Sequence, residues 1–294
     1  MSFNNQKKGM LIAFVGIMFI TPDSLFIRLA IIDSWNLIFY RGLIPFLVVF
    51  IGLLIIYKTR LIKEIINNGL HGFFYALIFT ITNIVFIYSI ENTTAANTLI
   101  MIALAPMLSA IISFFFLGEV PDKKTWAAIV ATTLSVFYIF YDALGSGDLL
   151  GNFFGLICAT GLAVGAVIIR SAKKISLVPS AMLGKLMVSI IAFTVLITSP
   201  EFIIEQLKLQ KSDVWIIPLM CIMCVAIPFV MVTLAPRYIT AAEVNLFFLL
   251  ETILGPLWVW LVIKEQPSFE TIIGGTVIII TIGMHSALAL KKKK

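Results

Sequence analysis

The chain has 294 residues, of which 61% are hydrophobic and 12% are charged, and its mean hydropathy is +1.08. Soluble domains carry about 25% charged residues, and a soluble core has no room for this much apolar surface. The composition therefore excludes a water-soluble globule, a disordered chain and a nucleic-acid-binding domain, and it indicates an integral membrane protein. The net charge of +6 reports topology in such a protein and implies no acidic partner.

Apolar segments long enough to cross a membrane occupy most of the chain. A helix needs about 20 apolar residues to span the hydrocarbon layer. The first half contains five such segments, at residues 10–31, 35–57, 70–90, 94–117 and 125–141. After the break at residues 145–148, five more follow, at residues 151–172, 178–199, 214–237, 240–263 and 271–290. We therefore expect an all-α membrane protein with ten transmembrane helices and no soluble domain.

The basic residues predict the orientation of these helices. If the amino terminus is inside, 15 of the 21 basic residues lie at cytoplasmic ends of the spans and four at outer ends. Cytoplasmic loops of membrane proteins carry such an excess of Lys and Arg. We expect both termini in the cytoplasm, the connection at residues 145–151 outside, and the chain in a bacterial inner membrane.

The two halves of the sequence contain related motifs in the same order. Thr94-Ala95-Ala96 recurs as Thr240-Ala241-Ala242, Glu119-Val120-Pro121 as Glu265-Gln266-Pro267, and Ile27-Arg28 as Ile169-Arg170. Each half has five spans, an odd number, so the halves would lie in the membrane with opposite orientations. We expect residues 1–145 and 146–294 to form two inverted five-helix repeats, an arrangement typical of secondary transporters with a site between the halves.

Several local motifs, taken with the ten spans, resemble a known family. They are Phe39-Tyr40-Arg41-Gly42, Ala105-Pro106, Leu117-Gly118-Glu119 and the Thr/Ala-rich starts of the fourth and ninth spans. The chain resembles the EamA branch of the drug/metabolite transporter superfamily over essentially its whole length. The resemblance implies a ten-helix secondary transporter of a small organic metabolite, with export favoured. Two departures, Ile263-Lys264-Glu265 for Leu-Gly-Glu and the displacement of a proline to Pro256, predict a different bend in the ninth span.

Two ionisable residues lie at equal depth on consecutive spans. Asp23 and Arg41 each lie about 10–12 Å below the outer surface, at 1.5 Å per residue. An ionisable group is costly in hydrocarbon, so a pair between them is expected. The pair is either a structural clasp or an outer gate, and in the second case Arg41 could hold a substrate carboxylate.

Two further charges make the halves chemically different, because Lys185 has no symmetry-related partner and Glu251 has no acidic counterpart in the first half. Lys185 occupies the position equivalent to Arg41, but Gly165 stands where Asp23 would be. We expect Lys185 to extend toward water at the inner boundary, and it remains a gating or charge-pair candidate. Glu251 lies near the centre of the ninth span, too deep to reach an interface, and it is the candidate for proton coupling or for binding a substrate ammonium group. Glu243 forms a capping-box pattern with Thr240.

Neutral polar and aromatic residues within the spans predict a central cavity. A largely apolar cavity with a few convergent polar groups suits a small organic metabolite, such as an amino acid or similar zwitterion. Interhelical hydrogen bonding is the alternative role for the amides. The cavity candidates are Asp23, Asn83, Asn97, Met101, Phe229, Asn245, Phe248 and Glu251.

No motif indicates a cofactor, a metal or catalysis. The chain has no phosphate-binding Gly-rich loop, and Cys221-x-x-Cys224 stands alone in an apolar segment, so neither a cofactor nor a metal is expected. The expected partners are a small-molecule substrate and the lipid bilayer, with no nucleic acid, and the protein is a monomer or a homodimer. An uptake permease, a lipid-linked metabolite flippase, a passive channel and a membrane-embedded enzyme are the alternatives, and the sequence leaves the substrate, the direction and the coupling ion open.

Overall fold

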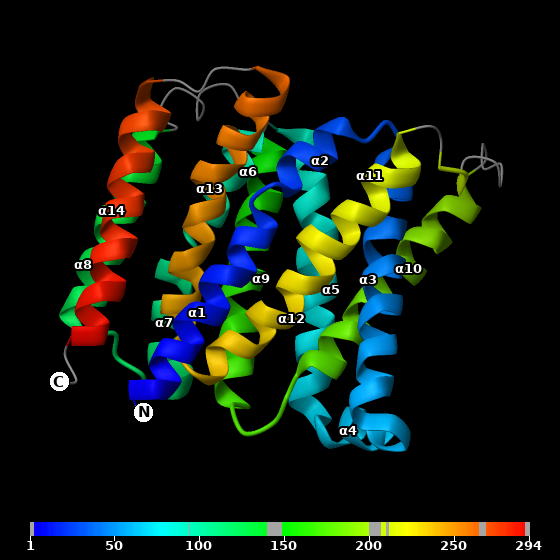
Figure 1. Cartoon of the computed structure of the whole chain (residues 1–294), viewed down its shortest axis with the longest axis horizontal. Coiled ribbons are helices and arrows are strands. Elements are labelled where there is room, and N and C mark those ends of the chain that lie inside the picture. The colour runs from blue at the N-terminus through cyan, green and yellow to red at the C-terminus, as the bar shows by residue number, and fades with distance from the viewer. Residues whose placement is uncertain are drawn as a thin grey trace.

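The computed structural model describes residues 3–93, 95–139, 149–199, 207–209, 212–264 and 269–291. Within these residues the chain is a bundle of helices without strands (Figure 1). Seven helical units of this part are long and apolar enough to cross a membrane. They are Asn5–Leu29, Ser34–Asn67, Gly69–Asn92, Leu149–Ser171, Val178–Thr198, Asp213–Arg237 and Ala241–Ile263. The predicted connection at residues 145–148 and the repeated Glu265 motif lie outside the described residues.

The helices of the first half include two interrupted spans. In order they are α1 (Phe3–Ile20), α2 (Asp23–Leu29), α3 (Ser34–Tyr57), the short η1 (Lys58–Arg60) and α4 (Leu61–Asn67), α5 (Gly69–Asn92), α6 (Ala95–Ile102), α7 (Ala105–Leu117) and α8 (Lys123–Ile139). The predicted first span is divided at Thr21 and Pro22, and the predicted fourth span is divided just before Pro106. Proline has no N–H to continue the helical ladder, which explains why a new helix begins at each of these positions.

The helices of the second half contain one widened turn. They are α9 (Leu149–Ser171), α10 (Val178–Thr198), α11 (Asp213–Met220), η4 (Cys221–Ala226), α12 (Ile227–Leu234), η5 (Ala235–Arg237), α13 (Ala241–Ile263) and α14 (Phe269–Lys291). The segment η4 is π-helical and ends two residues before Pro228. Pro228 cannot donate to a carbonyl in the preceding turn, and the wider π-helical turn accommodates that missing bond.

The predicted boundaries agree with the structure where a span is one helix. The helices α3, α10 and α13 end within one residue of the predicted segments. The expected difference between the fourth and ninth spans is also present, because α13 continues as a helix through residue 256 whereas α6 and α7 are separate. Lys264 ends α13 with φ 67°, close to the 61° of Gly118 after α7. Lys264, which stands where the family pattern has glycine, therefore still adopts the left-handed conformation that ends the helix.

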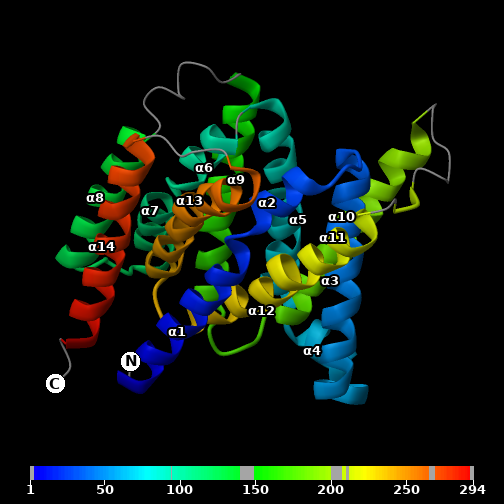
Figure 2. The ribbon, with the colours of Figure 1, turned by 45° about the horizontal axis from the view of Figure 1, so that its top comes forward.

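The two halves of the chain pack into each other. The long helix α9 contacts α5, α6, α7 and α13, α10 contacts α3 and α5, and α1 contacts α12. In both ribbon views α8 and α14 form one edge of the bundle, α3 and α10 form the other, and α5 and α9 lie between them (Figures 1 and 2). The start of α1 and the end of α14 lie at the same end of the bundle (Figure 1).

Small residues allow the closest of these contacts. A Cβ atom on Gly42 of α3 would lie 2.6 Å from the backbone nitrogen of Ser189 in α10. A Cβ atom on Gly161 of α9 would collide with the Thr82 hydroxyl of α5. These glycines bring α10 and α9 close to the first half, and the helices so placed form the walls of a central cavity.

Candidate functional site

A cavity of about 1010 Å³, counting the space at its open mouth, lies among the central helices. Most of its surface is apolar. The aromatic residues that line it are Tyr75, Phe79, Phe86, Phe229 and Phe248.

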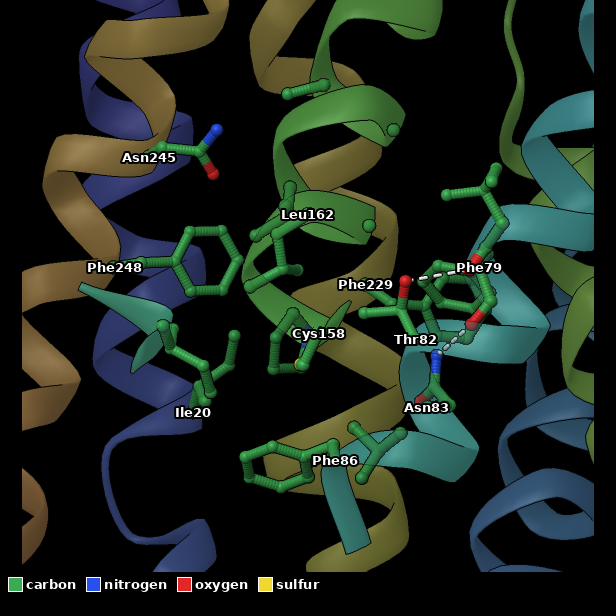
Figure 3. Close-up of a pocket in the computed structure, with 18 of the residues that line it drawn as sticks. Ile20, Phe79, Thr82, Asn83, Phe86, Cys158, Leu162, Phe229, Asn245 and Phe248 are labelled. Atoms are coloured by element: carbon green, nitrogen blue, oxygen red, sulfur yellow. Dashed lines mark hydrogen bonds between the residues drawn. The ribbon is translucent and has the colours of Figure 1, made fainter. Parts of the chain in front are cut away.

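Helices from both halves of the chain supply the walls that Figure 3 shows. Phe79, Thr82 and Asn83 come from α5 on one side, and Asn245 and Phe248 reach inward from α13 on the other (Figure 3). Leu162 and Cys158 of α9 lie between them. The first and second halves of the chain therefore both contribute to the cavity.

A buried ion pair lines the cavity. Arg41 of α3 donates from Nη1 to Oδ1 of Asp23 at 2.7 Å and from Nη2 to Oδ2 at 2.8 Å. Asp23 is in the first turn of α2, directly after the break at Pro22, and both side chains are buried. This two-bond geometry is the strongest arrangement that a guanidinium and a carboxylate form. The pair that equal depth predicts is therefore present in the structure.

Lys185 of α10 points into the cavity, so the expectation that it extends to the inner boundary is wrong. Its side chain is 1% exposed. The Nζ atom donates to Oδ1 of Asn83 at 2.5 Å and lies 5.2 Å from the centre of the Phe79 ring. Asn83 and Phe79, both on α5, thus interact with the Lys185 ammonium group in place of water. Among the described residues, no carboxylate forms an ion pair with Lys185.

Glu251 lies on the α13 wall of the cavity and is 7% exposed. Within the described part of the chain, its carboxylate has neither a hydrogen bond nor an ion pair. The Asp23–Arg41 pair lines the same cavity. An ionisable group buried at membrane depth without a partner is a candidate functional group.

Asn245 also faces the cavity with an unused hydrogen-bonding group. It is 1% exposed, and its buried Nδ2 has no partner among the described residues. Asn83 differs, because its Oδ1 accepts from Lys185 and its Nδ2 donates to the carbonyl of Phe79 at 2.7 Å. Asn245 is therefore the amide that remains available to a ligand.

Of the other predicted cavity residues, two line the cavity and one packs in the core. Phe229 and Phe248 line the cavity. Met101 does not: α6 packs so closely on α9 that Met101 Cβ lies 2.8 Å from where a Cβ of Gly155 would be, and its side chain contacts the core instead. The side chain of Asn97 lies outside the part that the structure describes.

The predicted capping box of Thr240 and Glu243 is confirmed. Thr240 caps α13, because its backbone N–H donates to Glu243 at 2.7 Å and its hydroxyl accepts from the Glu243 N–H at 3.2 Å. Cys221 and Cys224 are buried thiols. In the described ranges no group of three or more metal-ligating side chains comes together.

One ion pair was not predicted from the sequence. Arg170, at the end of α9, donates from Nε to Glu119 at 2.9 Å and from Nη1 to the Pro236 carbonyl at 3.3 Å. Glu119 follows α7, and Pro236 in η5 lines the cavity. Although Arg170 lies in the last turn of its helix, it is buried. The available signal was two opposite charges at span ends on the same predicted side of the membrane.

This second ion pair lies at the end of the bundle where α1 begins (Figure 1), beside the cavity-lining Pro236. Tyr238, two residues beyond Pro236, lies beneath the Lys8 ammonium of α1, with 5.1 Å between Nζ and the ring centre. Arg237 also binds the loop after α9, through the Lys173 carbonyl at 3.1 Å. The ends of α7, α9 and α12 are thus joined at one face.

Comparison with known proteins identifies one family. The model of the EamA-like transporter family matches residues 7–141 and 149–286. No curated protein matches the chain. Of 29 matching chains in solved structures, one crystal structure, titled only as a protein, is 15% identical with a TM-score of 0.76 over 98% of this chain and 100% of its own. At that identity the likeness concerns the fold alone.

The family match confirms the resemblance seen in the sequence motifs and covers both halves of the chain. Together with the seven long apolar helices, it makes the protein a multi-pass integral membrane protein.

Proposed function

Because this chain belongs to the EamA-like transporter family, we propose that it moves a small zwitterionic metabolite, such as an amino acid, across the membrane by alternating access. Export is the favoured direction. The supporting observation is an apolar cavity between the two halves that contains one cation and one anion, Lys185 and Glu251, without an ionic partner among the described residues. Such buried charges are retained in membrane proteins where a substrate or an ion uses them.

Transport of zwitterions is tested with purified protein in proteoliposomes. Radiolabelled neutral amino acids inside the vesicles should exchange with unlabelled amino acids outside, and organic cations or anions of similar size should not compete. Exchange of a mono-charged metabolite with no response to any amino acid would contradict the proposed substrate class. Vesicles of known protein orientation, loaded from either side, then distinguish export from uptake.

The proposed topology is ten crossings in two inverted repeats, residues 1–145 and 146–294. The α6–α7 pair, α8 and α14 would supply three crossings beside the seven long apolar units. An even number of crossings places both termini on one side, and the distribution of Lys and Arg favours the cytoplasm of a bacterial cell.

Cysteine labelling tests this topology. The native cysteines are buried, so an impermeant maleimide should label Ser146→Cys in intact cells above a low background. Labelling of that variant only after permeabilisation would reverse the assignment.

In alternating access, the cavity is open at one face of the membrane and closed at the other, and the two faces exchange these states. In this proposal, the Arg170–Glu119 pair and the Arg170–Pro236 contact hold the cavity closed at the face where α1 begins. We infer that opening on that face breaks these contacts. The Asp23–Arg41 pair lies elsewhere along the cavity wall and is the gate candidate for the opposite side.

Glu251 has two candidate functions in transport, as a proton carrier or as the ligand of a substrate ammonium group. A proton carrier would be needed for gradient-driven accumulation and dispensable for exchange. An ammonium ligand would be needed for both. The comparison of accumulation with exchange in Glu251→Gln therefore separates the two functions.

A further inference from the structure

Two opposite charges in the cavity are available to a ligand, and they stand on opposite walls. Lys185 belongs to α10 and Glu251 to α13. In both ribbon views these helices lie on opposite sides of α5 and α9 (Figures 1 and 2). We propose that Lys185 binds the carboxylate of the substrate and Glu251 binds its ammonium group, so that the cavity holds a zwitterion in one orientation. This inference rests on the proposed function.

The environment of Lys185 prepares it to bind a carboxylate. An ammonium group has three donors, and one of them is used by Oδ1 of Asn83. The Asn83 amide is itself fixed, because its Nδ2 donates to the Phe79 carbonyl. The Phe79 ring lies against the ammonium group on one side and forms a cation–π interaction with it. The remaining two donors have no partner among the described residues, and both oxygens of a carboxylate could accept from them.

The neighbouring charges, Asp23 and Arg41, already bind each other. Both terminal nitrogens of Arg41 donate to Asp23, one to each carboxylate oxygen. Arg41 Nη1 also contacts the Met220 sulfur at 3.5 Å. A substrate carboxylate at Arg41, or an ammonium group at Asp23, would have to break two charge-assisted hydrogen bonds. Lys185 and Glu251 offer the same charges without that cost.

The rest of the cavity suits the apolar side chain of an amino acid, which branches from the carbon that bears both charged groups. Phe86 and Phe229 line it together with Phe79 and Phe248. Gly165 of α9 leaves its wall without a side chain. The free Nδ2 of Asn245 offers one hydrogen bond on the α13 side. The cavity therefore matches an amino acid with a large apolar or aromatic side chain.

The orientation can be tested with three matched ligands and purified protein. L-phenylalanine carries both charges, its amide lacks the carboxylate, and 3-phenylpropionate lacks the ammonium group. Each lost charge-assisted contact should weaken binding about 10- to 100-fold. The wild-type protein should therefore prefer the amino acid over both analogues, as measured by isothermal titration calorimetry, with L-leucine and its analogues as a second set.

Two variants then assign the ends of the ligand. Lys185→Met should weaken binding of the amino acid and remove its advantage over the amide, while binding of the amide itself changes little. Glu251→Gln should remove the advantage over 3-phenylpropionate and leave the advantage over the amide. Lys63→Met, which removes an exposed cation of α4 far from the cavity lining, is the matched control and should bind as the wild type does.

Thermal unfolding separates binding from a structural role. If Lys185 only held α10 against α5, Lys185→Met would lower the melting temperature. The proposal predicts an unchanged or higher melting temperature with weaker binding, because a buried charge without an ionic partner is removed.

Two results would overturn the assignment in different ways. Normal zwitterion binding with unchanged discrimination in both variants would overturn the assignment of the two ends and leave the proposed function standing. Binding of none of the zwitterions by the wild type would overturn the proposed substrate class, and the assignment with it.

Discussion

Two pairs of opposite charges line the same cavity, and they differ in what they bind. Asp23 and Arg41 bind each other through two short hydrogen bonds. Lys185 and Glu251 stand apart, and within the described residues neither has an ionic partner. The first pair is complete without a ligand, whereas the second is completed only by a molecule that brings both charges.

This difference has opposite consequences for stability. Removing one member of a buried pair leaves the other charge buried and uncompensated, which costs about 3–5 kcal/mol. Removing a charge that already lacks a partner relieves a penalty instead. Variants of the Asp23–Arg41 pair should therefore lose stability, and variants of Lys185 or Glu251 should lose function while stability is retained.

The largest expected effect is on the paired charges. Arg41→Gln should lower the stability of the folded protein by about 3–5 kcal/mol, because the Asp23 carboxylate is left buried. The double variant Asp23→Asn/Arg41→Gln should lose less than the sum of the single variants. Thermal unfolding in detergent measures all three. Additive effects of the two substitutions would show that the pair is not an energetic unit.

The next effect concerns the unpaired carboxylate. Glu251→Gln keeps the side-chain shape and removes the charge, so substrate binding should weaken about 10- to 100-fold. Gradient-driven accumulation and exchange should both fall in proteoliposomes, with the melting temperature unchanged. Loss of accumulation with normal exchange would identify Glu251 as a proton carrier and would contradict its role as ammonium ligand.

A smaller effect is expected at the closed end of the cavity. Glu119→Gln weakens a partly exposed ion pair with Arg170 by about 1 kcal/mol, which is a factor of about five in the opening equilibrium. Cys158 and Cys224 line the cavity, so their alkylation from the face where α1 begins should become faster by that factor. Glu64→Gln in α4 is the control. Unchanged alkylation in Glu119→Gln would show that this ion pair does not hold the face closed.

The smallest expected effect is at the unsatisfied amide. Asn245→Leu removes a buried donor without a partner and keeps a similar volume, so stability should rise by about 1 kcal/mol. Binding of a zwitterion should weaken by less than tenfold, because the two charged contacts remain. A loss of stability in the melting curve would mean that Asn245 has a structural partner in the folded protein.

The sequence predicted features that depend on position along a helix. The depth of Asp23 and Arg41 placed them opposite each other, and the Thr240 capping box is local. The single-helix spans, such as α3 and α10, follow directly from apolar length.

Features that depend on helix rotation could not be predicted from one sequence. Lys185 faces Asn83 because α10 lies against α5, and Met101 faces Gly155 because α6 lies against α9. Nearly every position of these segments is apolar, so hydropathy does not distinguish the face toward lipid from the face toward the cavity. The Arg170–Glu119 pair joins residues 51 positions apart. Their common predicted side of the membrane allows the pair, but it does not distinguish it from pairs with the other charges on that side.

The most direct test of the unpaired charges is an experimental structure with the tightest-binding zwitterion of the ligand panel in the cavity. The account predicts its carboxylate within about 3 Å of Lys185 Nζ and its ammonium group at the same distance from Glu251, with the Asp23–Arg41 pair intact. A substrate in the reverse orientation, or one that binds Arg41 after displacing Asp23, would contradict the account.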